Sequence, residues 1–258
     1  MSVLVVSSEK LEQKNTLNEE QQFTVVVPAA GVGKRMLALC PKQYLTINNE
    51  TILSHTVNRL LSHKSISKVV LVLSDDDDYF EQTALLNNPN IIRVSGGKER
   101  VDSVLNGLQQ VNALEWVLVH DAARPCVTHD DISKLIDHCL NNNNGGILAA
   151  PVVDTMKLAN NTSQHQTVQV NKTIERSLLW HAYTPQMFKA NTLIKAIEHA
   201  QLKGLPITDE ASAIESLNLP CSLVLGRRDN IKITRPEDLL LASFYLEQQR
   251  KLTTNQRI

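Results

Sequence analysis

The sequence predicts an α/β fold, a doubly wound and mostly parallel sheet with a protruding β-arm. The first observation is a set of short runs that are apolar throughout, which is typical of strands covered on both faces. These runs occupy residues 24–27, 69–73, 91–94, 116–119 and 147–153. The second observation is that segments with helical spacing separate the runs, as in a parallel sheet with right-handed crossovers. The third is that the alternation of strand and helix patterns stops at about residue 154, where the arm begins.

Amphipathic spacing predicts the individual helices. Three segments carry a single apolar stripe each, at residues 52–61, 101–111 and 132–140. The arm, at about 154–178, combines short alternating pieces with a polar turn and resembles a hairpin more than a βα unit. The elements expected beyond it are helices near 191–201 and 209–217, strands at 222–225 and 231–233, and a last helix with Pro236 in its first turn.

The composition excludes several classes of function. Of the 258 residues 42% are apolar, which argues against global disorder, and a formal net charge of −1 gives no electrostatic footprint for nucleic acid or an anionic membrane. No apolar run approaches the roughly 20 residues that span a bilayer. Residues 1–22 lack the basic start of a signal peptide, so we interpret them as an extension before a single domain at 23–250. Four cysteines without CxxC spacing indicate thiols and a cytoplasmic protein.

The strongest chemical signal, PAAGVGKRM, directly follows the first predicted strand. Such a turn suits an oxygen-rich anion, because unpaired amides and a helix dipole favour negative charge. It is neither a Walker A loop nor the dinucleotide fingerprint, because Met36 stands where a third glycine is needed. The alternative is a tight strand–helix connection with incidental glycines. The candidate nucleotide-binding positions are Pro28, Ala29, Ala30, Gly31 and Gly33.

Two cations near this loop favour a triphosphate as the anion. Arg35 lies just past the glycines, and Lys42 follows in the segment CPKQY. A guanidinium fork and an ammonium are the usual means of neutralising transferring phosphoryl oxygens. The alternative is that both side chains are simply solvated at the surface.

A second glycine-containing turn, SGGKERVDS, joins a strand to a helix. Gly96 and Gly97 permit close backbone contact, and Ser103 lies about one turn into the helix. Main-chain groups at such a turn can read the edge of a base. A turn followed by a helix cap explains the pattern equally well.

The segment VHDAARP places an acid at the end of a buried strand, where α/β sheets bind their ligands. Asp121 is a candidate ligand of Mg²⁺, which takes one or two carboxylates and keeps waters, and Arg124 is a candidate clamp for an anionic group. The alternative for Asp121 is a helix cap or a turn. We interpret His120 as a packed residue at the strand end. Neither a HxxxH pair nor a Gly-x-Ser-x-Gly elbow occurs, so zinc chemistry and a serine nucleophile lack support.

Polar residues at predicted element edges lie further along the chain. Thr155, Thr184 and Thr208 are candidates for hydrogen bonds to a hydroxylated phosphate ester. Lys232 stands between Ile231 and Ile233 in a predicted strand, which places it on the face opposite to theirs. That face looks either into the cleft or, in an edge strand, into water.

Together these motifs resemble a known family. Between about Phe23 and Leu246 the chain carries, in this order, PAAGVGKRM, CPKQYL, SGGKERVDSV, VHDAARP, APVVDTMK, WHAYTPQMF, ITDEASA and DNIKITRPEDL. They are similar to the 2-C-methyl-D-erythritol 4-phosphate cytidylyltransferases, nucleotidyltransferases of the nonmevalonate isoprenoid pathway. Many sugar nucleotidyltransferases share the first motif, whereas its conjunction with DAARP, TDEA and NIKITRPED is specific. The resemblance implies a Rossmann-like nucleotidyltransferase fold whose arm interlocks two subunits into a homodimer.

The resemblance also implies the reaction. CTP and methylerythritol phosphate give the CDP-linked alcohol and pyrophosphate, with Mg²⁺, and the acceptor phosphate attacks the α-phosphorus directly. No nucleophilic side chain is required, so the protein supplies positioning and charge stabilisation. Arg35, Lys42 and Lys232 are implied as the catalytic cations, and Asp229 as a second metal contact beside Asp121. The other implied positions are Ala29, Ala30, Gly31, Gly33, Gly96, Gly97 and Ser103 for the nucleotide, Asp121, Arg124, Thr155, Thr184 and Thr208 for the acceptor, and Arg176 acting in the partner's active site.

Two other functions stay open at this point. A cytidylyltransferase for another polyol phosphate, such as ribitol phosphate, shares the loop and the pair of cations. A non-catalytic nucleotide-binding module would bind without releasing pyrophosphate, but it leaves Arg35, Lys42 and Lys232 unexplained together. The segment TPQMF and Arg176 favour methylerythritol phosphate over ribitol phosphate.

Overall fold

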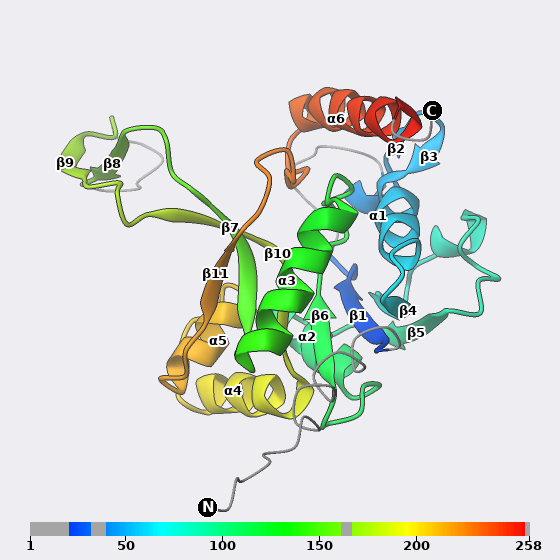
Figure 1. Ribbon diagram of the computed structural model, residues 1–258, viewed down its shortest axis with the longest axis horizontal. Coiled ribbons are helices and arrows are strands. Elements are labelled where there is room, and N and C mark those ends of the chain that lie inside the picture. Colours follow the sequence, from blue (N-terminus) through cyan, green and yellow to red (C-terminus); the bar gives the residue numbers. More distant parts are fainter. Residues whose placement is uncertain (1–20, 32–39, 161–166, 256–258) are drawn as a thin grey trace, which may run out of the picture.

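A seven-stranded sheet forms the centre of the structure, a computed structural model that describes residues 21–31, 40–160 and 167–255. Its strand order is β11-β7-β10-β6-β1-β4-β5 (Figure 1). Only β10 runs antiparallel to its neighbours, which confirms the doubly wound, mostly parallel prediction. The strands are β1 (Phe23–Pro28), β4 (Ile66–Leu73), β5 (Ile91–Ser95), β6 (Trp116–Val119), β7 (Gly146–Pro151), β10 (Trp180–Lys189) and β11 (Ser222–Leu225).

Helices cover both faces of this sheet, which explains why its central strands are apolar throughout. In β1 the side chains of Val25 and Val27 join one buried cluster, whereas Val26 between them joins another on the opposite face. The first cluster includes residues of α1 (Ile52–Leu61) and α3 (His129–Asn142). The second includes residues of α2 (Arg100–Leu108), α4 (Ala190–Leu202) and α5 (Glu210–Ser216).

The strand order reverses between β1 and β6. From β1 the chain moves outward to β4 and β5, and it then returns to β6 on the other side of β1. In open α/β sheets a crevice forms outside the carboxyl ends of strands at such a switch point. The segments that follow Pro28 and Val119 therefore lie where a ligand site is expected.

The last helix, α6 (Pro236–Asn255), packs beside the small pair of strands β2 (Thr46–Ile47) and β3 (Glu50–Thr51). A third apolar cluster joins these parts and includes Ile233, Ala242 and Leu246. The start predicted for this helix is confirmed. None of the helices in the described ranges has the length and apolar content needed to cross a membrane.

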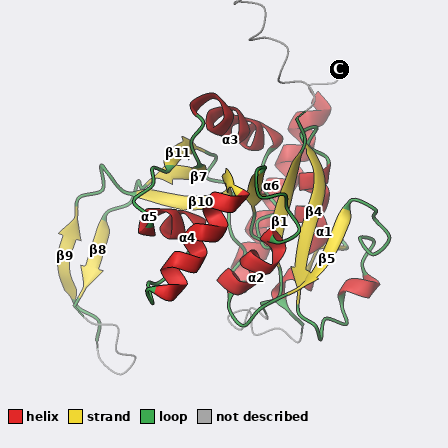
Figure 2. Cartoon of the chain, turned by 90° about the horizontal axis from the view of Figure 1, so that it is seen from below, coloured by secondary structure: helices red, strands yellow, loops and turns green. Residues whose placement is uncertain are grey.

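The predicted arm is present. Strands β8 (Met156–Ala159) and β9 (Val170–Ile174) pair antiparallel in a separate two-stranded sheet. Figures 1 and 2 show this pair projecting to one side, away from the central sheet. The side chains of β8 and β9 are almost all exposed.

One predicted strand is absent, and one strand of the central sheet was not predicted. Residues 231–233 form no strand. Ile231 and Ile233 pack against the α6 cluster, and the backbone bond from Ile233 N to Ala123 O is not continued into a ladder with a neighbouring strand. Strand β10 was not predicted. Pro185 interrupts it after a cis peptide bond, and the pairing with β7 shifts register at this place, since proline has no N–H for the ladder.

Candidate active site

Two adjoining cavities lie at the switch point and share one wall. The larger, about 290 Å³, lies beyond β1 and β6, and the smaller, about 210 Å³, lies toward β10 and α5. Arg100, Asp121 and Lys232 line both. The larger cavity is otherwise lined by Pro28, Ala29, Ala30, Gly31, Lys42, Gln43, Gly97, Lys98, Glu99, Ser103, Ala122 and Ala123, and the smaller by Arg124, Ala182, Tyr183, Thr184, Gln186, Thr208 and Asp209.

The first loop forms one side of the larger cavity. Ala29 continues the β1 ladder, because its N–H donates to Val72 O at 2.8 Å, and its carbonyl accepts from Gln43 Nε2 at 2.6 Å. These bonds fix the start of the loop. Pro28, Ala30 and Gly31 follow around it and line the cavity. Gly33 and Arg35, which the sequence also nominates, lie outside the described residues.

Lys42 enters the same cavity from the short 3₁₀ turn Lys42–Tyr44. Gln43 and Tyr44 anchor this turn because both side chains are buried, and Tyr44 Oη donates to Asp77 Oδ2 at 2.7 Å. Asp77 belongs to an acidic run and also accepts N–H bonds from Tyr79 and Phe80. Lys42 Nζ donates to the carbonyl of Ile233 at 3.1 Å, so the turn brings Lys42 beside the segment that carries Lys232.

The second glycine turn forms the opposite side of the larger cavity. Gly97 lines it, and its N–H donates to Ser103 Oγ at 3.1 Å. Gly96 has a packing role instead, because an added Cβ would lie 2.5 Å from the Cβ of Ala30. The two loops therefore touch, with Gly97, Ser103 and the loop after β1 facing one space.

Asp121 lies two residues after the end of β6 and stands in the shared wall between three cations. Its Oδ2 lies 2.9 Å from Lys232 Nζ and 3.2 Å from Arg124 Nε, and its Oδ1 lies 3.2 Å from Arg100 Nη2. Burial by itself would raise the pKa of Asp121, but Arg100, Lys232 and Arg124 outweigh it and hold that pKa well below its usual range. The carboxylate therefore stays charged throughout the physiological range.

Lys232 reaches the wall although its segment is not a strand. Ile231 and Ile233 on either side of it pack into the α6 cluster, which leaves the lysine side chain on the cavity side. Its ammonium is paired with Asp121 and a little over one third of the side chain is exposed. The side-chain alternation predicted from the sequence is thus present without the strand.

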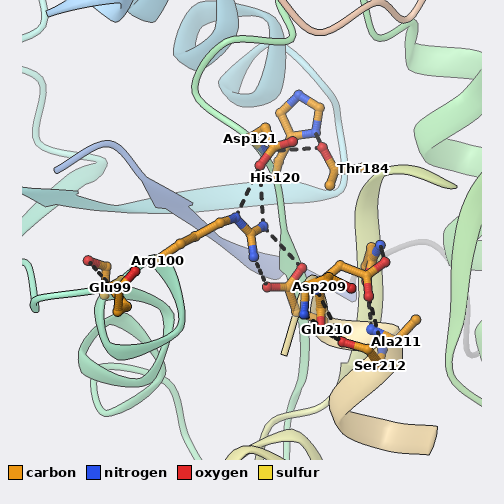
Figure 3. A network of polar contacts seen from close by, with 12 residues as sticks. Glu99, Arg100, His120, Asp121, Thr184, Asp209, Glu210, Ala211 and Ser212 are labelled. Atoms are coloured by element: carbon orange, nitrogen blue, oxygen red, sulfur yellow. Dashed lines mark hydrogen bonds and ion pairs between the residues drawn. The ribbon is translucent and has the colours of Figure 1, made fainter. Parts of the chain in front are cut away.

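Arg100 and Glu210 were not singled out from the sequence, although both stand inside its motifs. Arg100 is the first residue of α2 and Glu210 the first of α5, and the two side chains meet (Figure 3). Nη1 of Arg100 donates to Glu210 Oε1 at 2.7 Å and Nη2 donates to Oε2 at 3.2 Å, while Nε and Nη2 donate to Asp121 Oδ1. Burial would lower the pKa of Arg100, but Glu210 and Asp121 outweigh it and raise that pKa.

His120 is fully buried, as predicted for a packed residue at the strand end. Its Nε2 faces the carbonyl of Arg124 at 3.1 Å, and its Nδ1 faces Thr184 Oγ1 at 3.0 Å. The carbonyl can only accept, so we assign the proton to Nε2 and the donor role to the Thr184 hydroxyl. The same hydroxyl oxygen accepts the N–H of Asp121 at 3.0 Å (Figure 3). Burial lowers the pKa of His120 to about 4, so the imidazole is neutral.

The predicted acceptor residues divide into two groups. Arg124, Thr184 and Thr208 line the smaller cavity together. Thr155 and Arg176 lie at the arm, where both are exposed, and Arg176 Nη1 donates to the carbonyl of Val153. The strands β8 and β9 that these two residues flank project away from the central sheet (Figure 2).

The two predicted metal contacts also separate. Asp121 faces both cavities, and one carboxylate together with substrate phosphate oxygens is a donor set that suits Mg²⁺. Asp229 does not fit because it lines neither cavity, and its two oxygens accept from Arg227 at distances down to 2.6 Å. The described part of the chain contains no group of three or more His, Cys, Asp or Glu side chains arranged to hold a metal.

Comparison with known proteins decides the family. The sequence profile of the 2-C-methyl-D-erythritol 4-phosphate cytidylyltransferases matches residues 23–248. This chain belongs to that family. A cytidylyltransferase of the same name from Colwellia psychrerythraea is 59% identical over 233 residues, which cover 88% of this chain and 96% of the relative. One from Vibrio vulnificus is 54% identical over 232 residues, with the same coverage.

Solved structures of cytidylyltransferases share the fold. The crystal structure of the Francisella tularensis 2-C-methyl-D-erythritol 4-phosphate cytidylyltransferase is 32% identical, with a TM-score of 0.75 and coverage of 87% of this chain and 100% of that one. A crystal structure of a 4-diphosphocytidyl-2C-methyl-D-erythritol synthase is also 32% identical, with a TM-score of 0.74 over 88% of this chain and 99% of that one. Membership of the cytidylyltransferase family makes the chain a nucleotidyltransferase.

Proposed function

We propose that this chain transfers the cytidylyl group of CTP to 2-C-methyl-D-erythritol 4-phosphate, giving 4-diphosphocytidyl-2-C-methyl-D-erythritol and pyrophosphate. The observation that carries this proposal is the wall shared by the two cavities, where Asp121, Lys232 and Arg100 stand. A reaction that joins two phosphate groups needs positively charged side chains where the two groups approach each other. Here two cavities meet at three cations.

The larger cavity is the proposed CTP site. Backbone groups at Ala29, Ala30 and Gly31 approach the phosphates, as does Gly33 in the remainder of the loop. On the opposite side, Gly97 and Ser103 offer groups to the cytosine and the ribose, with Gly96 supporting them by its packing on the loop. Main-chain donors and acceptors distinguish cytosine from uracil through the exocyclic group at position 4, which donates in one base and accepts in the other.

The smaller cavity is the proposed acceptor site. Arg124, Thr184 and Thr208 supply one guanidinium and two hydroxyl groups for a phosphate and a polyol. The acceptor phosphate attacks the α-phosphorus of CTP directly. One phosphorus–oxygen bond forms, the bond to the oxygen bridging toward the β-phosphorus breaks, and pyrophosphate leaves with that electron pair.

Side chains stabilise this step without forming a covalent bond. Lys42 and Lys232, which the contact of Lys42 Nζ with the Ile233 carbonyl brings close together, would neutralise the charge that develops around the α-phosphorus. Arg35 has the same proposed role from the loop. Asp121 would hold Mg²⁺ together with phosphate oxygens of CTP, and the bound ion neutralises the triphosphate. We do not include Asp229 in this set because it lines neither cavity and its carboxylate pairs with Arg227.

A homodimer would complete the site. Thr155 and Arg176 flank the arm strands β8 and β9 and line neither cavity of their own chain, so we infer that they serve acceptor binding in another copy. We propose that the arm places Arg176 of the partner subunit at the acceptor. The cytoplasmic location also remains a prediction, supported by four cysteines that are all thiols.

The test is pyrophosphate release by the purified chain with Mg²⁺, measured with CTP or UTP and with methylerythritol phosphate or ribitol 5-phosphate. We expect release with CTP and methylerythritol phosphate and much slower release in the other combinations. Faster turnover of ribitol 5-phosphate would favour the other polyol cytidylyltransferase. Binding of CTP without any release would favour a non-catalytic module.

A further inference from the structure

The guanidinium of Arg100 links two carboxylates that lie on different elements. One belongs to Asp121 in the wall between the cavities, and the other belongs to Glu210 at the start of α5. The Glu210 side chain is only 2% exposed, whereas that of Arg100 is 32% exposed and lines both cavities. Glu210 therefore stands behind Arg100 as seen from the substrates.

We propose that Glu210 is a positioning residue for cytidylyl transfer, and that it acts through Arg100 on the Asp121 carboxylate. This inference rests on the proposed function. Two parallel N–H···O bonds hold the guanidinium edge on Glu210, which fixes the plane of the fork. The remaining Nε–H, together with Nη2, then meets Oδ1 of Asp121 and leaves Oδ2 to Lys232 and Arg124. The orientation of the Asp121 carboxylate follows from that of Glu210.

The frame around Glu210 is rigid enough for this role. Asp209 and Ser212 form a reciprocal cap at the start of α5. Gln186 on β10 ties this turn to the sheet, because its Oε1 accepts the N–H of Ala211 at 2.9 Å and its Nε2 donates to Asp209 Oδ2 at 2.9 Å. Figure 3 shows Arg100 extending from α2 toward this turn and toward Asp121.

Loss of the Glu210 charge should lower the catalytic rate more than the affinity for substrate. Without the Glu210 charge, Arg100 keeps Asp121 as its only carboxylate partner among the bonds described and is free to turn toward substrate phosphates. That movement adds an attraction to the bound triphosphate while it releases the Asp121 carboxylate. Ground-state binding is then preserved or improved, and the arrangement needed in the transition state is lost.

The experiment compares Glu210→Gln with the wild-type enzyme in the pyrophosphate assay. We expect kcat to fall about 10- to 100-fold, as is usual for a group that orients a reacting-site residue, while KM for CTP changes less than about threefold. Asp131→Asn is the matched control, because Asp131 is also a fully buried acid in the first turn of a helix and lies outside both cavities. It should keep kcat within about twofold of wild type.

A double-mutant cycle separates positioning from a general structural role. Arg100→Lys keeps the charge but lacks the planar fork that makes two parallel bonds to Glu210 while it also bonds Asp121, and we expect it to lower kcat as Glu210→Gln does. Adding Glu210→Gln to Arg100→Lys should lower kcat by no more than about a further twofold, because the first change already breaks the link. If Glu210→Gln does not fold, a loss of kcat at unchanged KM in Arg100→Lys supports the inference and wild-type kcat there contradicts it.

Three results would overturn the inference while the wild-type enzyme releases pyrophosphate. The first is a Glu210→Gln variant with wild-type kcat. The second is a double variant in which the kcat losses of Glu210→Gln and Arg100→Lys multiply fully. The third is a loss of kcat in Asp131→Asn as large as that in Glu210→Gln. A wild-type chain that releases no pyrophosphate from CTP and methylerythritol phosphate contradicts the proposed function itself, and the positioning role with it.

Discussion

Thr184 Oγ1 lies 3.0 Å from both Nδ1 of His120 and the backbone nitrogen of Asp121. One hydroxyl on β10 thus holds the end of β6 at the residue that separates the two cavities. The three groups lie in a buried environment, where each needs a partner. Strand β10 therefore serves the site through its hydrogen bonds as well as through its place in the sheet.

Thr184→Val should destabilise the protein. Valine keeps the shape but leaves the Asp121 N–H and the His120 Nδ1 without the hydroxyl, and burying such groups unpaired costs about 1–3 kcal/mol. Urea unfolding should show this decrease in the free energy of unfolding with an unchanged m-value. Thr184→Ser retains the hydroxyl and should recover most of the loss. Equal stability of the valine variant and the wild type would contradict the hydrogen-bond assignment.

Stability should decrease as the pH falls from 7 to 5. Burial lowers the pKa of His120 from 6.5 to about 4, so in this window the unfolded chain takes up a proton that the folded chain does not. The loss from His120 between pH 7 and pH 5 is about 2 kcal/mol. His63, whose pKa burial also lowers to about 4, acts in the same direction.

Urea unfolding at several pH values checks this dependence. His63→Gln should make the decrease shallower, because it removes one of these two buried imidazoles. Stability that is constant between pH 7 and pH 5 would show that His120 is protonated in the folded protein.

Lys42→Ala should lower kcat about 10²- to 10³-fold, the usual effect of removing one group that stabilises developing charge. Affinity for CTP should change less, because the lost interaction strengthens in the transition state. Single-turnover kinetics and equilibrium binding of CTP measure the two effects separately. Lys203→Ala, an exposed lysine after α4, is the control. Equal losses in binding and in rate would assign Lys42 to ground-state binding alone.

Mixing two inactive variants tests the shared site. An Arg176→Ala subunit has an intact Asp121, and an Asp121→Ala subunit has an intact Arg176, so each heterodimer carries one complete site. Random exchange should restore about a quarter of the wild-type activity, since half of the dimers are mixed and each has one of its two sites intact. Exchange is verified with differently tagged subunits. Verified exchange without recovery would exclude action of Arg176 across the interface.

Local patterns predicted most of the elements. Continuous apolar runs located β1, β4 and β6 because helices cover both sheet faces, and the stripe at 52–61 coincides with α1. Strand β10 escaped prediction because Pro185 lies inside it, and a proline normally argues against a central strand. The pattern placed Lys232 opposite Ile231 and Ile233 but left open whether it faces the cleft or water; in the structure it lines both cavities, and burial of its neighbours in the α6 cluster replaces the expected strand.

The site could be predicted only where a residue carries its own local signal. Asp121 ends a buried strand, and the loop after β1 is rich in small residues, so both stood out. Arg100 and Glu210 did not, because they are 110 residues apart and their pairing arises only when α2 and α5 pack on the same sheet face. Asp229 was expected as a metal contact only through the family resemblance, and in the structure it lines neither cavity.

A crystal structure with CTP and Mg²⁺ tests the central claim most directly. We predict the triphosphate in the cavity formed by the loop after β1 and the start of α2, with its α-phosphate between Lys42 and Lys232, at the wall that faces the second cavity. A triphosphate bound elsewhere, with both lysine side chains directed into solvent, would contradict this account of the site.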